Sequence, residues 1–185
     1  MSVNARGLTV YSLGHSTHSM EEFVALLQEF GIELLADIRS LPGSRRLPHF
    51  NKENLAAILP REGIRYMHLP ALGGLRRSAK GFESPNTGLT SPAFRSYADY
   101  MAGEEFRQGV RELLAMARQQ RTAVMCAEVL FWRCHRRLLC DYLTVHGAKV
   151  IHIFGHGKSQ PHAMTPEAVR TSRGQLVYPP AKRAG

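Results

Sequence analysis

The sequence predicts an α/β protein, a single three-layer domain with a mostly parallel sheet of about five strands. Short apolar, β-rich runs alternate along the chain with segments in which apolar residues recur at helical spacing. The expected strands cover residues 8–13, 32–36, 64–69, 122–126 and 149–154. Such alternation builds a parallel sheet through right-handed crossovers. At 185 residues, 44% of them hydrophobic, the chain is long enough for one buried core.

The first strand ends at a polar turn, residues 14–16, and a helix follows it. Ser19 and Glu22 form a capping-box pattern at the start of this helix, and Gly31 is placed to end it. The second strand is largely apolar, as expected of a parallel strand covered on both faces. Residues 37–50 contain two prolines, a glycine and three arginines, so regular structure is not expected throughout them.

Later helices have equally local start and stop signals. Asn51 can cap the second helix, and Ser91 with Pro92 marks the start of the third, because proline is favoured at the first helical position. Gly103 separates this helix from a fourth. A last helix is expected to begin near residue 134 and to stop near Gly147.

The α/β domain is expected to span residues 1–154, and residues 155–185 to form a basic C-terminal tail that wraps the domain or is partly disordered. This tail holds four prolines and few large apolar residues. The whole chain carries a formal net charge of +9, and the tail contributes +4 from five basic residues and one glutamate. A surplus of positive charge favours phosphates and other polyanions as partners, although a solvated chain end explains the tail equally well.

The sequence predicts a cytoplasmic protein without a membrane partner. No apolar run approaches the roughly 18 residues of a membrane helix, and the first seven residues lack the apolar core of a signal peptide. The three cysteines, at positions 126, 134 and 140, match no disulfide framework, so reduced thiols are the simplest interpretation. The oligomeric state is left open.

Polar side chains follow several of the predicted strands. The densest cluster, residues 126–137, combines two thiols, a carboxylate, an imidazole and three guanidinium groups. Because the carboxyl ends of parallel strands lie at one edge of a sheet, side chains that follow different strands are expected to share one rim. The rim residues are His15, Ser16, Arg39, Arg45, Gly73, Gly74, Cys126, Glu128 and His152.

Anion binding is the first chemistry expected of this rim. The candidates are Arg39, Arg45, Arg136, Ser16 and Cys134. Arginine offers forked donors to phosphate oxygens, and the helix that begins near Cys134 adds free backbone N–H groups. No glycine-rich nucleotide fingerprint accompanies them. The alternative is that the arginines pair with Asp37 and Glu128 or lie in solvent.

Acid-base catalysis is the second chemistry expected of this rim. Glu128 with His135 or His15 would supply an acid and a base, because a carboxylate at a buried strand end near arginine and histidine is in a setting where pKa values shift. A structural ion pair of Glu128 with Arg39 or Arg136 is the alternative.

The cysteines allow two further interpretations. Neither has the Cys-x5-Arg spacing of a phosphatase loop, although Cys134 at a helix start would have a lowered pKa and would be the better nucleophile. Cys126, Glu128, Cys134 and His135 are metal-ligand types without the usual pair spacings, so no metal or other cofactor is expected. The aromatic residues Phe50, Phe82, Phe131 and Trp132 lie in or beside polar loops, where they would stack a base or pin the loop to the core.

Several separate short motifs occur in order along the chain. They cover residues 12–16, 37–45, 48–50, 72–74, 126–128, 134–136, 150–153 and 161–165. Together they resemble the DUF488 family of bacterial and archaeal proteins over about residues 8–166. The resemblance implies an α/β domain with a shared polar site and no catalytic assignment. It favours the candidates above, which fall on these motifs, over Arg46, Trp132 and Cys140, which are peripheral.

We therefore expect an enzyme, a hydrolase or transferase without a redox cofactor, acting on a phosphate-containing ligand such as a nucleotide or nucleic acid. Two alternatives remain open. One is a non-catalytic sensor that binds such a ligand in the same pocket, and the other is a zinc or iron protein.

Overall fold

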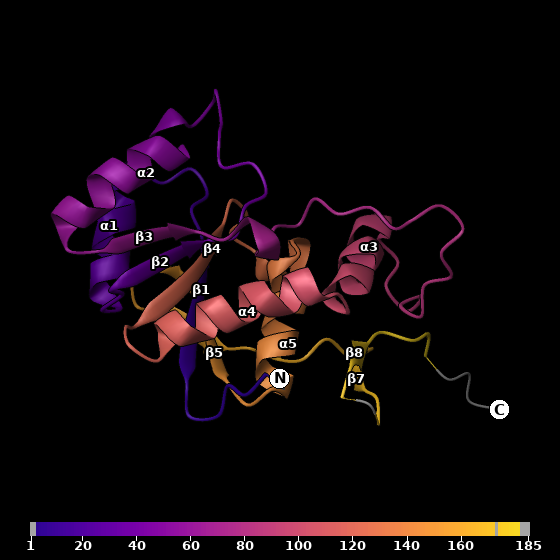
Figure 1. Ribbon diagram of the computed structural model, residues 1–185. Coiled ribbons are helices and arrows are strands. Elements are labelled where there is room, and N and C mark those ends of the chain that lie inside the picture. Colours follow the sequence, from indigo (N-terminus) through magenta and orange to yellow (C-terminus); the bar gives the residue numbers. More distant parts are fainter. Residues whose placement is uncertain (1–2, 173, 182–185) are drawn as a thin grey trace.

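A six-stranded sheet in the order β3-β2-β4-β1-β5-β6 forms the centre of the computed structural model, which describes residues 3–172 and 174–181 (Figure 1). Five strands are parallel and β6 is antiparallel to β5. The strands are β1 (Thr9–Gly14), β2 (Leu34–Asp37), β3 (Arg65–His68), β4 (Thr122–Cys126), β5 (Lys149–Gly155) and β6 (Lys158–Pro161). The predicted α/β class and mostly parallel sheet are confirmed.

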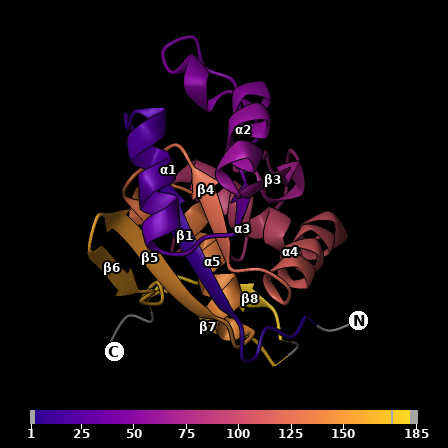
Figure 2. The ribbon, with the colours of Figure 1, turned by 90° about the vertical axis from the view of Figure 1, so that its left-hand side faces the viewer.

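Helices cover both faces of this sheet. They are α1 (Met20–Glu29), α2 (Lys52–Ile58), α3 (Pro92–Met101), α4 (Glu104–Ala117) and α5 (Arg136–Val145). The first two share one apolar core with the sheet, and the other three share a second core on the opposite face (Figures 1 and 2). The molecule therefore has three layers.

The alternation of side chains along each strand divides the two cores. In β2, Leu34 and Ala36 belong to the core under α3, α4 and α5, whereas Leu35 belongs to the core under α1 and α2. All four residues of this strand are buried. A strand covered on both faces reads as a continuous apolar run, which is why period-two alternation is absent from its sequence.

Most of the local signals are realised. Ser19 and Glu22 form both hydrogen bonds of the capping box of α1, and the Ser91 side chain caps α3. Asn51 precedes α2 as predicted, but its side chain does not cap the helix. Its Oδ1 accepts instead from the backbone N–H of Ser44, at 2.5 Å, and holds the preceding loop.

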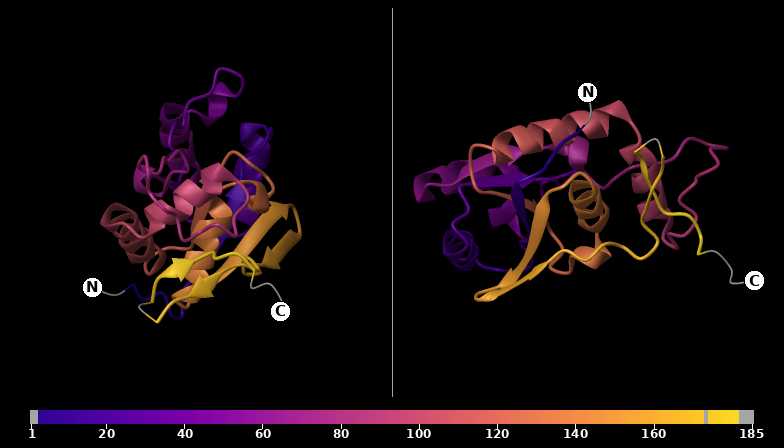
Figure 3. Two further views of the ribbon diagram at one scale, coloured as in Figure 1. Left: turned by 90° about the vertical axis from the view of Figure 1, so that its right-hand side faces the viewer. Right: turned by 90° about the horizontal axis from the view of Figure 1, so that it is seen from below.

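The segment after β5 returns along the sheet edge as β6 and then forms a small hairpin of β7 (Val169–Arg170) and β8 (Leu176–Val177), drawn in yellow in Figure 3. Tyr178, which follows the hairpin, is buried, and its hydroxyl donates to Asp141 at 3.0 Å. Arg173 and residues 182–185, which belong to the expected basic tail, lie outside the described residues.

Among residues 3–172 and 174–181, no helix is both long and apolar enough to cross a membrane.

Candidate functional site

The carboxyl ends of β1, β2 and β4 lie side by side and bring three polar segments together. Beyond the strands the backbone pairing continues, because His15 N–H donates to Cys126 O at 2.9 Å and Ser16 N–H donates to Ala127 O at 3.0 Å. The turn after β1 is therefore fixed against the segment after β4.

This junction is tightly packed and locally strained. A Cβ atom added at Gly14 would lie 1.8 Å from Glu128 O, so only glycine fits there. Ser16 has a φ of 51°, in the left-handed region that residues with a side chain rarely adopt. Backbone strain of this kind is concentrated at functional sites.

A pocket of about 330 Å³ opens at this edge of the sheet. Residues from four parts of the chain surround it: the segment after β2, the loop near Gly74, the start of α3, and the connection from β4 to α5. Its lining comprises Arg39, Ser40, Leu41, Gly74, Leu75, Ala93, Phe94, Cys126, Ala127, Glu128, Cys134 and His135. Six of these were singled out in the sequence: Arg39, Gly74, Cys126, Glu128, Cys134 and His135.

Arg39 is anchored by a buried carboxylate. Its Nε and Nη2 donate to the two oxygens of Asp37 at 2.9 and 2.6 Å, and Nη2 also donates to Phe50 O at 2.7 Å. Asp37 is 0% exposed and accepts a further hydrogen bond from the Tyr66 hydroxyl at 2.7 Å. Burial, followed by the charge of Asp37, raises the pKa of Tyr66. These contacts leave only Nη1 of the guanidinium free of this carboxylate.

His15 occupies that remaining nitrogen. Its Nδ1–H donates to Ser16 O at 2.9 Å, which leaves Nε2 to accept from Arg39 Nη1 at 3.3 Å. The ring stacks on Phe50, with centroids 4.1 Å apart. Burial lowers the pKa of His15 to about 4, so the imidazole is neutral at pH 7. Because both nitrogens are engaged, His15 can act as a base only after Arg39 moves.

Two thiols meet in the wall of the pocket. The Sγ atoms of Cys126 and Cys134 are 3.1 Å apart, and the backbone N–H of Arg136 donates to Cys134 Sγ at 3.3 Å. The hydrogen bond from Cys126 lowers the pKa of Cys134, and the nearby Arg136 guanidinium lowers it further. The same hydrogen bond and burial raise the pKa of Cys126. Cys134 is therefore the more acidic thiol of the pair.

Arg136 is 1% exposed and lies behind these thiols. Its Nη2 donates to Glu128 O and Val129 O at 2.8 and 3.0 Å, which holds the loop after β4. Nε and Nη1 have no partner among the described residues, and no carboxylate there pairs with Arg136. Among the described residues, its side-chain hydrogen bonds therefore go to main-chain carbonyls.

His135 is half-buried on the opposite wall. Its Nε2–H donates to Ile38 O at 3.2 Å, so Nδ1 carries the lone pair. A Cβ atom at Gly74 would lie 2.4 Å from this Nδ1, so glycine is required beside the ring. Burial lowers the pKa of His135, which is neutral at pH 7.

Glu128 was expected to be a carboxylate at a buried strand end, and the structure places it elsewhere. It is exposed at the lip of the pocket, and neither ion pair considered for it forms, because Arg39 pairs with Asp37 and Arg136 with main-chain carbonyls. The carboxylate at the buried strand end is Asp37. Glu128 also borders a second hollow, of about 400 Å³, that contains His15 and Ser16. Glu128 therefore lines both hollows.

Two rim candidates lie elsewhere. Arg45 is exposed in the loop after β2 and does not line the pocket. His152 lies within β5, opposite Ser12 of β1, and is 1% exposed in the interior. Of the aromatic residues, Phe50 and Phe131 are buried and pin their loops, whereas Trp132 and Phe82 are 44% and 54% exposed.

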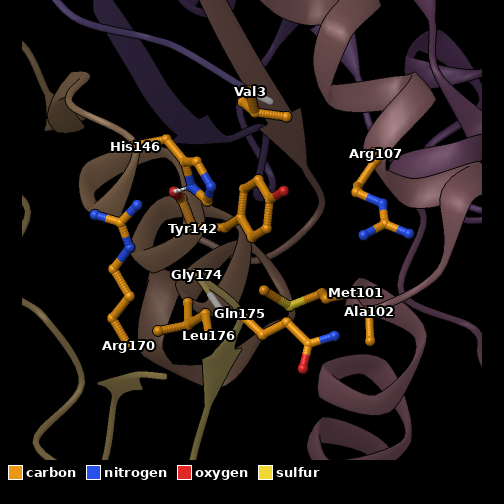
Figure 4. A pocket seen from close by; sticks show the side chains of 10 residues that line it. All are labelled: Val3, Met101, Ala102, Arg107, Tyr142, His146, Arg170, Gly174, Gln175 and Leu176. Atoms are coloured by element: carbon orange, nitrogen blue, oxygen red, sulfur yellow. Dashed lines mark hydrogen bonds between the residues drawn. The ribbon is translucent and has the colours of Figure 1, made fainter. Parts of the chain in front are cut away.

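A separate cavity, of about 270 Å³, lies among α4, α5 and the β7–β8 hairpin (Figure 4). Arg107 and Arg170 face it, as does His146, whose ring is hydrogen-bonded to Tyr142 O at 2.8 Å. None of the residues proposed for the site lines this cavity.

Fold and site define an α/β protein with a composite pocket, lined by apolar and polar side chains, at the carboxyl ends of parallel strands. A family model described as "Domain of unknown function DUF488" matches residues 19–143. This match covers more than half of the chain, and the protein belongs to the DUF488 family. No curated protein and no solved structure matches the chain.

Proposed function

We propose that the pocket is the active site of a hydrolase or transferase in which the Cys134 thiolate is the nucleophile and the substrate is a phosphate-containing molecule. The observation that carries this proposal is the thiol pair. Cys134 Sγ accepts from a second thiol at 3.1 Å and from the N–H of Arg136 at 3.3 Å, and it lines the pocket. A thiolate is a far better nucleophile than a thiol, so these contacts prepare Cys134 for attack.

The lining of the pocket indicates how a substrate would lie. Leu41, Leu75 and Phe94 form an apolar side that suits a base or another flat group. The lining also contains Arg39, whose Nη1 would have to exchange His15 for a phosphate oxygen, and the start of α5 at Cys134 and His135, where free backbone N–H groups would add to the binding of the phosphate. A nucleotide, or one nucleotide of a nucleic acid, has this combination of an apolar face and an anionic group.

The proposed reaction has two steps. Cys134 Sγ attacks phosphorus, the bond from phosphorus to the leaving oxygen breaks, and a proton from solvent reaches that oxygen through Glu128. A water molecule or an acceptor hydroxyl then attacks phosphorus, the S–P bond breaks, and the Glu128 carboxylate takes the proton. Glu128 suits both steps because its side chain is exposed at the lip of the pocket.

The same thiol pair supports a proposal for the compartment. Thiols 3.1 Å apart stay reduced only where the environment is reducing, so the cytoplasm is the proposed location.

A screen of nucleotides and other phosphate esters, read by release of inorganic phosphate and by mass spectrometry of the intact protein, tests the proposal. Wild-type protein should turn over at least one ester and form a phosphoryl adduct on Cys134. Cys134→Ser should abolish turnover, and Glu128→Gln should retain binding and lose turnover. Glu53→Gln, which removes an exposed carboxylate of α2, is the matched control. Turnover that survives Cys134→Ser would disprove the nucleophile.

A non-catalytic sensor is the second candidate. It is favoured by the mutual engagement of His15, Arg39 and Asp37, which makes this end of the pocket a rigid recognition surface with no free base. In this case the screen would find esters that bind and none that is turned over, and Glu128→Gln would change affinity alone.

A further inference from the structure

A second cluster of reactive side chains lies inside the domain, and none of its residues lines the pocket. Cys140 of α5, His152 of β5 and His162, which follows β6, each offer one ligand-type atom, and these atoms all lie within 4.8 Å of one another. Cys140 is 0% exposed and His152 is 1% exposed, and the His162 side chain is 1% exposed. Three successive parts of the chain thus converge at one buried point.

His162 is oriented from behind by a carboxylate. Its Nε2–H donates to Asp141 Oδ1 at 2.8 Å, so Nδ1 carries the lone pair and points toward His152 Nε2, 2.8 Å away. Asp141 in turn accepts from the backbone N–H of Thr165 at 2.9 Å and from the Tyr178 hydroxyl at 3.0 Å. A histidine that binds a metal commonly donates its other N–H to such an anchored carboxylate.

His152 is held equally firmly. Its ring lies flat on Phe131, with centroids 3.6 Å apart and an interplanar angle of 2°. Its Nδ1 lies 3.1 Å from Ser12 Oγ, so only Nε2 faces the cluster. Both imidazoles therefore present one nitrogen to the same space, and each has its other nitrogen occupied.

We propose that Cys140, His152 and His162 form a metal site for Zn²⁺ or a similar transition-metal ion, with Asp141 as the outer carboxylate that orients His162. One thiolate and two imidazoles are the ligands that such borderline ions prefer. They leave one position of a tetrahedral ion for a water molecule.

Binding requires two proton movements and a small adjustment. Cys140 loses its thiol proton to solvent, and the His152 proton moves from Nε2 to Nδ1, where it donates to Ser12 Oγ. Zn–N bonds of about 2.0–2.1 Å place two tetrahedral nitrogen ligands about 3.3 Å apart. The two ligand nitrogens, His152 Nε2 and His162 Nδ1, are 2.8 Å apart and must therefore separate by about half an ångström.

The charges near the site are compatible with a divalent cation. Arg136 lies four residues before Cys140 on α5, and its positive charge opposes a cation. The Cys140 thiolate and the Asp141 carboxylate supply two negative charges against it. Without an ion, the same residues form a hydrogen-bonded chain from Ser12 to Asp141, which is the arrangement that the experiment must exclude.

Metal analysis of the full-length protein tests the site independently of any activity. Protein grown with added zinc and purified without metal-affinity chromatography should contain about one zinc per chain by elemental analysis. Protein reloaded with Co²⁺ should show the ultraviolet thiolate-to-cobalt charge-transfer absorption. Wild-type protein that holds neither metal would overturn the proposal, whatever the variants do.

Variants locate the ion. Cys140→Ser should lose the cobalt absorption, and His162→Gln should lower the metal content at least tenfold. Cys134→Ser is the matched control, because it removes a buried thiol that belongs to the pocket and should leave the metal content unchanged. If the ion persists in Cys140→Ser and is lost in Cys134→Ser, it belongs to the pocket and the proposal is wrong. A Cys140→Ser variant that fails to fold leaves His162→Gln and the wild-type cobalt spectrum to decide.

Discussion

Arg39 and Arg136 both lie at the carboxyl edge of the sheet, and their surroundings are opposite. Arg39 follows β2 and is neutralised by a forked pair with Asp37, a carboxylate that is 0% exposed. Arg136 begins α5, is 1% exposed itself, and contacts main-chain carbonyls. Arg39 is thus paired with a carboxylate, and Arg136 is not paired with one among the described residues.

This difference assigns different work to the two residues. The Arg39 pair stiffens the wall of the pocket, because it joins β2 to the Phe50 loop and to His15. Arg136 acts on Cys134, whose thiolate it stabilises. Loss of the Arg39–Asp37 pair should therefore lower the stability of the fold, and loss of the Arg136 charge should change the reactivity of Cys134.

The largest effect is expected from Asp37→Asn. It leaves the Arg39 guanidinium buried without its countercharge and weakens the hydrogen bond of Tyr66, so the free energy of unfolding should fall by about 3–5 kcal/mol. Urea denaturation followed by circular dichroism measures the change.

Glu104→Gln provides the control. Glu104 pairs with Arg107 and Arg111 on the exposed side of α4, where an ion pair contributes at most about 1 kcal/mol. Equal losses in the two variants would show that the Asp37 pair is no different from a surface pair.

The second effect concerns pH. The pKa of His15 is about 4 in the folded protein and 6.5 in its reference state. The unfolded chain therefore binds more protons between these values, and stability should rise with pH across this window and level off above it. Between pH 7 and pH 4.5 this residue should account for a loss of about 2 kcal/mol.

The comparison of His15→Gln with wild type isolates that contribution. Gln is uncharged at both pH values, so the variant should lose less stability on acidification. Burial also lowers the pKa of His152, to about 3. His152 is present in both proteins, so its contribution to the pH dependence of stability cancels in the difference. Identical pH slopes for the two proteins would contradict a neutral His15 beside Arg39.

The fold followed from local patterns, because each element carries its own start, stop and apolar period. The strands, helices and capping box lie close to where the sequence places them. Strand β6 was missed because its four residues are all exposed and contain no apolar run. Asn51 was misjudged because a side chain can hold a neighbouring loop as readily as it can cap a helix.

The site was predictable in part for the same reason. Parallel strands end at one edge, which places Cys126 beside the turn after β1 and gathers six predicted residues at the pocket. The alternative that an arginine pairs with Asp37 is confirmed for Arg39, which lies only two residues further along the chain. Contacts between residues of different strands were not predictable, because they depend on strand order. The meeting of Cys140 with His152 and His162 joins elements whose spacing carries no signal.

The third and smallest effect is on the reactivity of Cys134, and it tests the role that distinguishes Arg136 from Arg39. Arg136→Met keeps most of the buried volume and removes the charge, so the pKa of Cys134 should rise and its rate of alkylation by iodoacetamide at pH 7 should fall about tenfold. Mass spectrometry of the Cys134 peptide over a range of pH measures the rate. Arg137→Met is the matched control, since this guanidinium bonds to Thr165 and pairs with Glu167. If both variants leave the pH profile unchanged, Cys126 alone stabilises the thiolate, and Arg136 serves only to hold the loop after β4.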